Sequence, residues 1–316
     1  MKKTVVACLL FMALGALPLT AQQSNPPAAP PAPAQQNSAA PPDMLVGPVQ
    51  ENLVYGVANG ETLLLDVFEP ANNTGLPRPG IILIHGGAWN SFDKSTMWPL
   101  AHFLAMAGFV AIPIDYRLFN NDINHWPAQL DDVQMAVRWV RANSGKYNID
   151  RNHIGAYGHS AGGQLALLLG MVDTRDNSDP TLAKYSSKVQ AVVDAAGPTD
   201  FTTQRDPDGV KYMSSFLDAE YTKHPEVWRD ASPISHTAKS NAPILIIHGT
   251  KDEFIPVADA DALDEALKKA GATVQYLRLD SDHEFSDPPS HRQLALETQT
   301  FFFHYLASPA AAAPAP

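Results

Sequence analysis

Short apolar runs alternate with longer amphipathic segments along residues 49–306. The short runs predict buried strands, and the longer segments, with apolar residues three and four positions apart, predict helices. The predicted strands are Leu63–Phe68, Ile81–His85, Phe109–Ile114, Ile154–Tyr157, Val189–Ala195, Ile244–His248 and Val274–Leu279; the predicted helices are Thr96–Ala107, Ala128–Asn143, Gly162–Met171, Ala258–Ala270 and His291–Leu306. This order predicts an α/β fold, a mostly parallel sheet with helices on both faces.

One interval, Phe201–Asn241, breaks the alternation. It contains Tyr212, Phe216, Tyr221 and Trp228 but no clear strand pattern. We interpret it as a small cap-like insertion. Its aromatic residues would either contact a substrate or simply pack the insertion onto the main domain, and the pattern does not choose between these.

The two ends differ from this middle part. Lys2 and Lys3 precede a nearly uncharged apolar run that ends near Ala21. This is typical of a signal peptide over residues 1–21, and it predicts export to the periplasm or the extracellular space. A membrane anchor is the alternative, but the run is short for a span, so we expect no stable membrane insertion after cleavage. A lipoprotein signal at Cys8 fits poorly, because the apolar run continues beyond it.

Residues 22–48 are mostly Pro, Ala, Gln and Ser, and residues 307–316 are Ala and Pro. Such segments cannot bury a core, so we predict a disordered linker and a disordered tail around one catalytic domain at residues 49–306.

The composition of the chain argues against several classes of partner and of site chemistry. The formal charge is −11, and cleavage of the signal peptide would remove two lysines and no acid, so nucleic acid is not an expected partner. Cys8 is the only cysteine and lies in the predicted signal peptide. The mature chain would then have no disulfide, no cysteine nucleophile and no cysteine-based zinc site.

Ser160 is the candidate nucleophile. It lies in Gly158-His159-Ser160-Ala161-Gly162, between a predicted strand and a predicted helix. A sharp turn there needs small neighbours and would expose the hydroxyl near the positive end of the helix. Because this pattern also occurs by chance in glycine-rich loops, the other parts of a site must support it.

The oxyanion donors are predicted at a second strand end. The strand Ile81–His85 runs into Gly86-Gly87-Ala88-Trp89, where glycines allow backbone N–H groups to turn toward a substrate. We assign Gly86 and Gly87 to the oxyanion hole, the group of backbone N–H donors that would bind the developing oxyanion, with the N–H of Ala161 as the other donor. Trp89, which follows directly, is a candidate substrate contact.

The acid and the base are predicted at two further strand ends. Asp252 follows the strand Ile244–His248, and His283 follows Val274–Leu279. Asp200 competes as the acid, but its Gly-Pro-Thr-Asp context also explains it as a turn residue. Ser160, Asp252 and His283 then follow the order Ser, Asp, His along the chain. Asp282 and Glu284 flank His283, yet we predict no metal site, because no matching histidine or cysteine spacing accompanies them.

These motifs together resemble the α/β-hydrolase superfamily over residues 49–306. More narrowly, HGGAWNSFDK and the later Asp115-Tyr116-Arg117-Leu118 resemble the bacterial feruloyl and acetyl esterases, which are related to hormone-sensitive-lipase-like esterases. The chain departs from the lipase-like pattern at Ala88, where a third glycine is usual, and at His159, where an aspartate is usual.

The resemblance implies a cofactor-independent serine esterase that forms an acyl-enzyme. Combined with export, it suggests removal of acetyl or feruloyl groups from plant cell-wall polysaccharides or oligosaccharides. The alternatives are a small-molecule carboxylesterase, an arylformamidase-type amide hydrolase, and a non-catalytic binding protein on the same fold.

Overall fold

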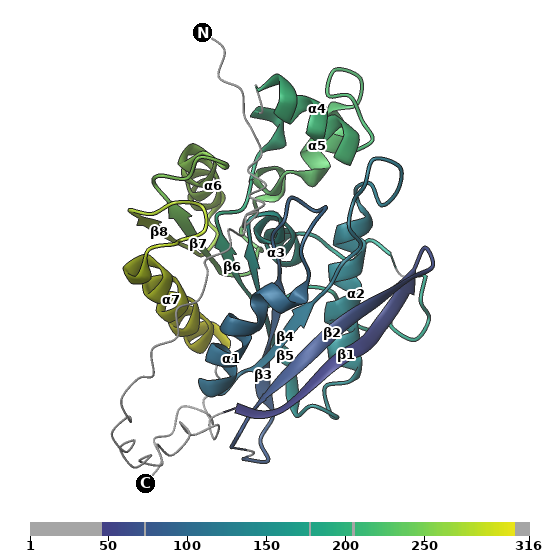
Figure 1. The fold of residues 1–316 in the computed structure, drawn as a ribbon, viewed down its shortest axis with the longest axis vertical. Coiled ribbons are helices and arrows are strands. Elements are labelled where there is room, and N and C mark those ends of the chain that lie inside the picture. The colour runs from purple at the N-terminus through teal and green to yellow at the C-terminus, as the bar shows by residue number, and fades with distance from the viewer. Residues whose placement is uncertain (1–45, 73, 177, 204–205, 307–316) are drawn as a thin grey trace, which may run out of the picture. The chain divides into compact units, whose positions relative to one another are not determined.

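The computed structural model describes residues 46–306, except residues 73, 177 and 204–205. These residues build one eight-stranded sheet in the order β1-β2-β4-β3-β5-β6-β7-β8 (Figure 1). β2 runs antiparallel to both its neighbours, and the pairs from β4 to β8 are parallel. The strands are β1 (Val46–Ala58), β2 (Glu61–Pro70), β3 (Arg78–Ile84), β4 (Val110–Ile114), β5 (Ile149–His159), β6 (Ala191–Ala195), β7 (Ile244–Gly249) and β8 (Val274–Leu279).

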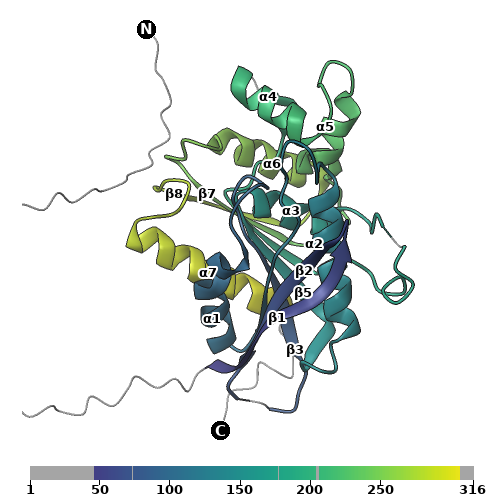
Figure 2. The ribbon, with the colours of Figure 1, turned by 45° about the vertical axis from the view of Figure 1, so that its right-hand side comes forward.

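Helices cover both faces of the sheet, as the alternating pattern predicts. α1 and α7 pack on one face, while α2, α3 and α6 pack on the other, so the core forms two apolar layers (Figure 2). The central strands β3, β6 and β7 are almost wholly buried because both their faces are covered. The helices are α1 (Trp98–Met106), α2 (Ala128–Ala142), α3 (Ala161–Met171), α6 (Val257–Ala270) and α7 (Pro288–Leu306).

The first strand corrects a predicted boundary. β1 begins at Val46, inside the stretch 22–48 predicted as linker, and pairs with β2 at the edge of the sheet. An edge strand tolerates Pro48, whose missing N–H would break a central ladder, and this hid the strand. The predicted signal peptide, the rest of the linker and the tail 307–316 lie outside the described residues. None of the helices among residues 46–306 is long and apolar enough to cross a membrane.

The predicted cap-like insertion folds as short helices: η2 (Phe201–Thr203), α4 (Pro207–Phe216), α5 (Pro225–Ala231) and η3 (Pro233–His236). Its aromatic residues divide between the two interpretations. Trp228 is buried and donates its indole N–H to the carbonyl of Ala219, which is ordinary packing. Phe216 stacks on Trp89 with ring centroids 4.5 Å apart. Tyr212 lines the cleft that also contains Ser160, and its hydroxyl donates a hydrogen bond to the carbonyl of Ala88.

Two adjacent phenylalanines of α7 test the core layer. Phe302 is fully buried and Phe303 is 40% exposed. We expect Phe302→Ala to lower the free energy of unfolding by about 3–5 kcal/mol, because it leaves a cavity against β5. Phe303→Ala should cost clearly less. Chemical denaturation of both variants measures the difference, and equal losses would contradict the packing described for α7.

Candidate active site

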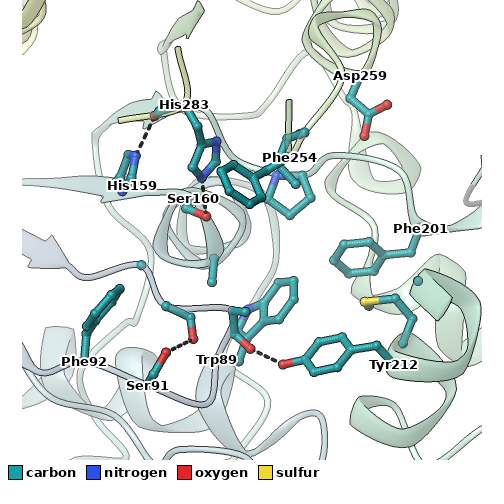
Figure 3. A pocket seen from close by; sticks show the side chains of 18 of the residues that line it. Trp89, Ser91, Phe92, His159, Ser160, Phe201, Tyr212, Phe254, Asp259 and His283 are labelled. Atoms are coloured by element: carbon teal, nitrogen blue, oxygen red, sulfur yellow. Dashed lines mark hydrogen bonds between the residues drawn. The ribbon is translucent and has the colours of Figure 1, made fainter. Parts of the chain in front are cut away.

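Ser160 lies at the sharp turn between β5 and α3, at the foot of a cleft (Figure 3). Its backbone has φ 54° and ψ −121°, a conformation that costs a residue with a side chain roughly 1–3 kcal/mol. The N–H of Ser160 donates to the carbonyl of Ala195 at 2.8 Å. This bond ties the strained turn to the end of β6.

The glycines around Ser160 are required by backbone contacts. A Cβ at Gly158 would lie 1.9 Å from the carbonyl oxygen of Gly162, and a Cβ at Gly162 would lie 2.2 Å from that of Ile84. Atoms cannot approach so closely, so the small neighbours predicted from the sequence are a steric necessity. The second contact also brings the end of β3 directly under the turn.

The loop after β3 therefore lies beside Ser160. A Cβ at Gly86 would come within 3.2 Å of the Ser160 Cβ, and Gly87 has φ +98°. Among the described residues, neither the N–H of Gly87 nor that of Ala161 donates a hydrogen bond. Free N–H groups beside a nucleophile are the donors that a developing oxyanion needs.

His283 lies between Ser160 and Asp252. Its Nε2 is 2.9 Å from the Ser160 Oγ, and its Nδ1 is 2.7 Å from an Asp252 carboxylate oxygen. Because the ionised carboxylate can only accept, Nδ1 carries a proton, and Nε2 is free to accept the serine hydroxyl proton. The arrangement can therefore activate Ser160 as a nucleophile.

Asp252 is held by several donors. Its Oδ1 accepts the N–H groups of Phe254 and Ile255, each at 2.8 Å, and its Oδ2 accepts from His283 and lies 3.2 Å from the Nε2 of His248. Burial alone would favour the neutral acid, but the contacts with His248 and His283 hold the pKa of Asp252 well below its usual range. Asp252 thus stays ionised at neutral pH.

Asp200, the competing acid, has a different place. Its Oδ1 accepts from both the N–H and the hydroxyl of Thr202. Among its hydrogen bonds within the described chain there is none to a histidine, so it acts as the turn residue that its sequence context suggests.

His159 explains one departure from the lipase-like pattern. Its Nε2 donates to the carbonyl of His283 at 3.0 Å, and the two rings lie 5.1 Å apart. Burial lowers the pKa of His159, so it is a neutral donor. His159 therefore holds the loop that carries His283. The sequence alone does not indicate this role, because only the fold brings the end of β5 and the loop after β8 together.

One group of side chains could in principle hold a metal. The ligand atoms of His159, His283 and Glu284 lie within 4.8 Å of one another. Both ring nitrogens of His283 already face Asp252 and Ser160, and Nε2 of His159 faces a carbonyl. The two histidines are therefore already engaged by other partners, which leaves only the exposed Glu284 available, so this group does not fit a resident metal.

The cleft above Ser160 has a volume of about 720 Å³. Trp89, Phe201, Tyr212 and Met213 form its wall on the cap side (Figure 3). Trp89 is 4% exposed and its indole N–H is engaged by Gln164, so it offers only ring surface to a ligand. A second cleft of about 530 Å³, between α1 and α7, shares lining residues with the first.

Two phenylalanines lie at the rim of the main cleft, on opposite sides of Ser160 (Figure 3). Phe254 is 76% exposed and Phe92 is 63% exposed. The Phe254 ring centroid is 5.3 Å from that of His283. An exposed aromatic residue next to the general base is available to a bound substrate.

The sheet order, the turn at Ser160 and the three residues that follow β5, β7 and β8 define an α/β-hydrolase. The fold is shared by a truncated carbohydrate esterase from gut microbiota, with a TM-score of 0.74, 25% identity, and coverage of 85% of this chain and 99% of that one. It is also shared by the butyrate-bound esterase Est2 of Thermogutta terrifontis, with a TM-score of 0.71, 25% identity, and coverage of 81% and 95%.

Within this class the chain belongs to the BD-FAE family, which it matches over residues 65–267. It is 35% identical over 238 residues to the esterase LipC of Mycobacterium tuberculosis, covering 73% of this chain. The chain spans only 58% of the length of LipC.

The contact between Gly162 and Ile84 can be tested directly. We expect Gly162→Ala to destabilise the fold by about 3 kcal/mol or more, because rigid backbone must move to admit the methyl group. The gain in helix propensity, about 1 kcal/mol, is too small to offset this. Gly145→Ala is the matched control, since a Cβ there meets nothing within 4 Å. Thermal unfolding of the two variants at equal midpoints would contradict the described turn.

Proposed function

We propose that this protein is a serine carboxylic-ester hydrolase with Ser160 as nucleophile, His283 as general base and Asp252 as the acid that orients it. The observation that carries the proposal is the position of His283, within hydrogen-bond distance of both partners. The esterase names of the relatives and structural neighbours support the same reaction.

The geometry supports a two-step reaction. His283 takes the Ser160 proton as the Oγ attacks the ester carbonyl, and the N–H groups of Gly87 and Ala161, with the Gly86 loop beside them, stabilise the oxyanion. His283 then gives the proton to the leaving alcohol, which departs as the acyl-enzyme forms. Water then attacks the acyl-enzyme, with His283 taking its proton. His283 passes this proton to the Ser160 Oγ as the carboxylic acid product is released. Every proton transfer uses a residue of this chain, so the proposed reaction needs no cofactor.

For the substrate we propose acetyl or feruloyl esters on plant cell-wall polysaccharides or oligosaccharides. Because His283 protonates the alcohol, the alcohol leaves on its side, where the exposed ring of Phe254 could stack on a sugar ring. The neighbouring cleft between α1 and α7 offers room for more of a polymer. The carbohydrate esterase among the structural neighbours supports this class. Export, proposed from the N-terminal sequence, would bring the enzyme to such polymers.

A small-molecule carboxylesterase is the second candidate. The cap-side wall of Phe201, Tyr212 and Met213 is apolar and would suit a short acyl chain, and a structural neighbour was solved with bound butyrate. An arylformamidase-type reaction would use the same nucleophile on an amide. Parallel assays with a soluble butyrate ester and N-formylkynurenine separate these alternatives.

The substrate proposal predicts Ser160-dependent deacylation of arabinoxylan. Residues 22–316 should release acetate or ferulate from acetylated or feruloylated arabinoxylan, and Ser160→Ala should release neither, because the nucleophile is gone. Ser240→Ala is the control, since Ser240 is exposed and does not line the cleft. Chromatography of the released acids measures both. Release that persists in Ser160→Ala would rule out the proposed mechanism.

Phe254 tests the alcohol side. We expect Phe254→Ala to raise KM for feruloylated xylo-oligosaccharide about 5-fold, the loss of roughly 1 kcal/mol of ring contact. The rate with p-nitrophenyl acetate should stay near that of the wild type. Phe92→Ala, at the opposite rim, is the matched comparison. Equal effects of Phe254→Ala on both substrates would contradict a sugar-binding role.

A further inference from the structure

A second buried histidine contacts the acid of the triad. His248 is the penultimate residue of the buried strand β7, its side chain is 0% exposed, and its Nε2 lies 3.2 Å from the Asp252 Oδ2. The same nitrogen lies 3.0 Å from the carbonyl of Ile255. A carbonyl oxygen only accepts, so Nε2 carries a proton, donates it to Ile255 and keeps it beside the Asp252 oxygen. The Asp252 oxygen that faces His283 is therefore also held from a second side.

A buried carboxylate lies behind His248. Asp194 of β6 pairs in register with Ile246, and His248 follows two positions further on the same face of β7. Asp194 is 0% exposed, and its Oδ1 accepts the N–H of Gly197 at 3.0 Å. Its Oδ2 and the Nδ1 of His248 are both buried without a hydrogen-bond partner in the described chain. Buried polar atoms of this kind are costly unless opposite charges compensate them.

The charges around His248 favour its protonated form. Burial lowers the pKa of His248, but the hydrogen bonds to Asp252 and Ile255 and the charge of Asp194 outweigh it, so its pKa is raised. Burial raises the pKa of Asp194 to about 7, although His248 opposes this. Asp259 of α6 adds a further negative charge, and His283 faces the same carboxylate.

We propose that His248 is a positioning residue for the reaction at Ser160: in contact with Asp252 and within the field of Asp194, it fixes the carboxylate that orients His283 and offsets part of its negative charge. This inference rests on the proposed esterase function. A series of side chains then runs from the core of the sheet to the nucleophile, in the order Asp194, His248, Asp252, His283 and Ser160.

The proposal predicts the direction in which the pH profile moves when His248 is replaced. A protonated His248 places positive charge beside Asp252 and so disfavours the binding of a second proton by His283. Removing that charge lets His283 retain its proton to higher pH, and a protonated His283 cannot activate Ser160. The acid limb of the profile of kcat/KM against pH must therefore move to higher pH. A residue that only fills space would not move it.

The experiment measures kcat/KM for p-nitrophenyl acetate from pH 5 to 9. It uses residues 22–316 as wild type, His248→Gln, His248→Asn and, as a control, His304→Gln, whose residue is exposed on α7. We expect His248→Gln to lower kcat/KM about 10-fold at pH 8 and to raise the acid-limb midpoint by about 0.5 pH unit. His248→Asn should move the midpoint in the same direction, and His304→Gln should change neither quantity.

Unchanged midpoints in both His248→Gln and His248→Asn, with an active wild type, would overturn this inference and leave the esterase proposal standing. If only one of the two variants folds, an unchanged midpoint in that variant suffices to overturn it. A wild type no faster than Ser160→Ala would overturn the esterase proposal and this inference together.

Discussion

The close approach of backbones at the Ser160 turn is the constraint on which the site depends. Gly162 touches the carbonyl of Ile84, and the Ser160 N–H is bonded to the carbonyl of Ala195, so three neighbouring strands end at one point. The strain of the turn, roughly 1–3 kcal/mol, persists because the surrounding sheet over-determines it. The same contact places the loop with Gly86 and Gly87 beside the hydroxyl. The glycines therefore serve the geometry of the reaction and not the flexibility of a loop.

Most of the fold could be predicted from the sequence because the central parallel strands are buried on both faces and read as plain apolar runs. The prediction was weakest where this signal is absent. β1 is an edge strand with several exposed residues and Pro48, and its pattern resembles the linker before it. β5 begins at Ile149, before the predicted Ile154, because Asp150–His153 are polar residues at the start of the strand. The short cap helices α4 and α5 have too few turns to show a clear period.

The candidate site divides in the same way. Ser160, Asp252 and His283 could be predicted because each follows a recognisable strand, and the structure brings them into hydrogen-bond contact. His159 could not be assigned a role, because its partner follows another strand, and His248 could not, because only the folded loop after β7 brings Asp252 and Ile255 back to its ring. A histidine four residues before the acid was the one available signal for His248. Burying an ionised carboxylate costs several kcal/mol, so the donors that surround Asp252 are as necessary as the triad itself.

The most direct test of the central claim is to identify the residue that forms a covalent adduct. Incubation of residues 22–316 with paraoxon, followed by peptide mass spectrometry, should locate one diethylphosphoryl group on Ser160, since among the described residues its hydroxyl is the one beside both His283 and the free N–H of Ala161. His283→Ala should label far more slowly. Labelling of another residue, or none on Ser160 in the folded protein, would contradict the account.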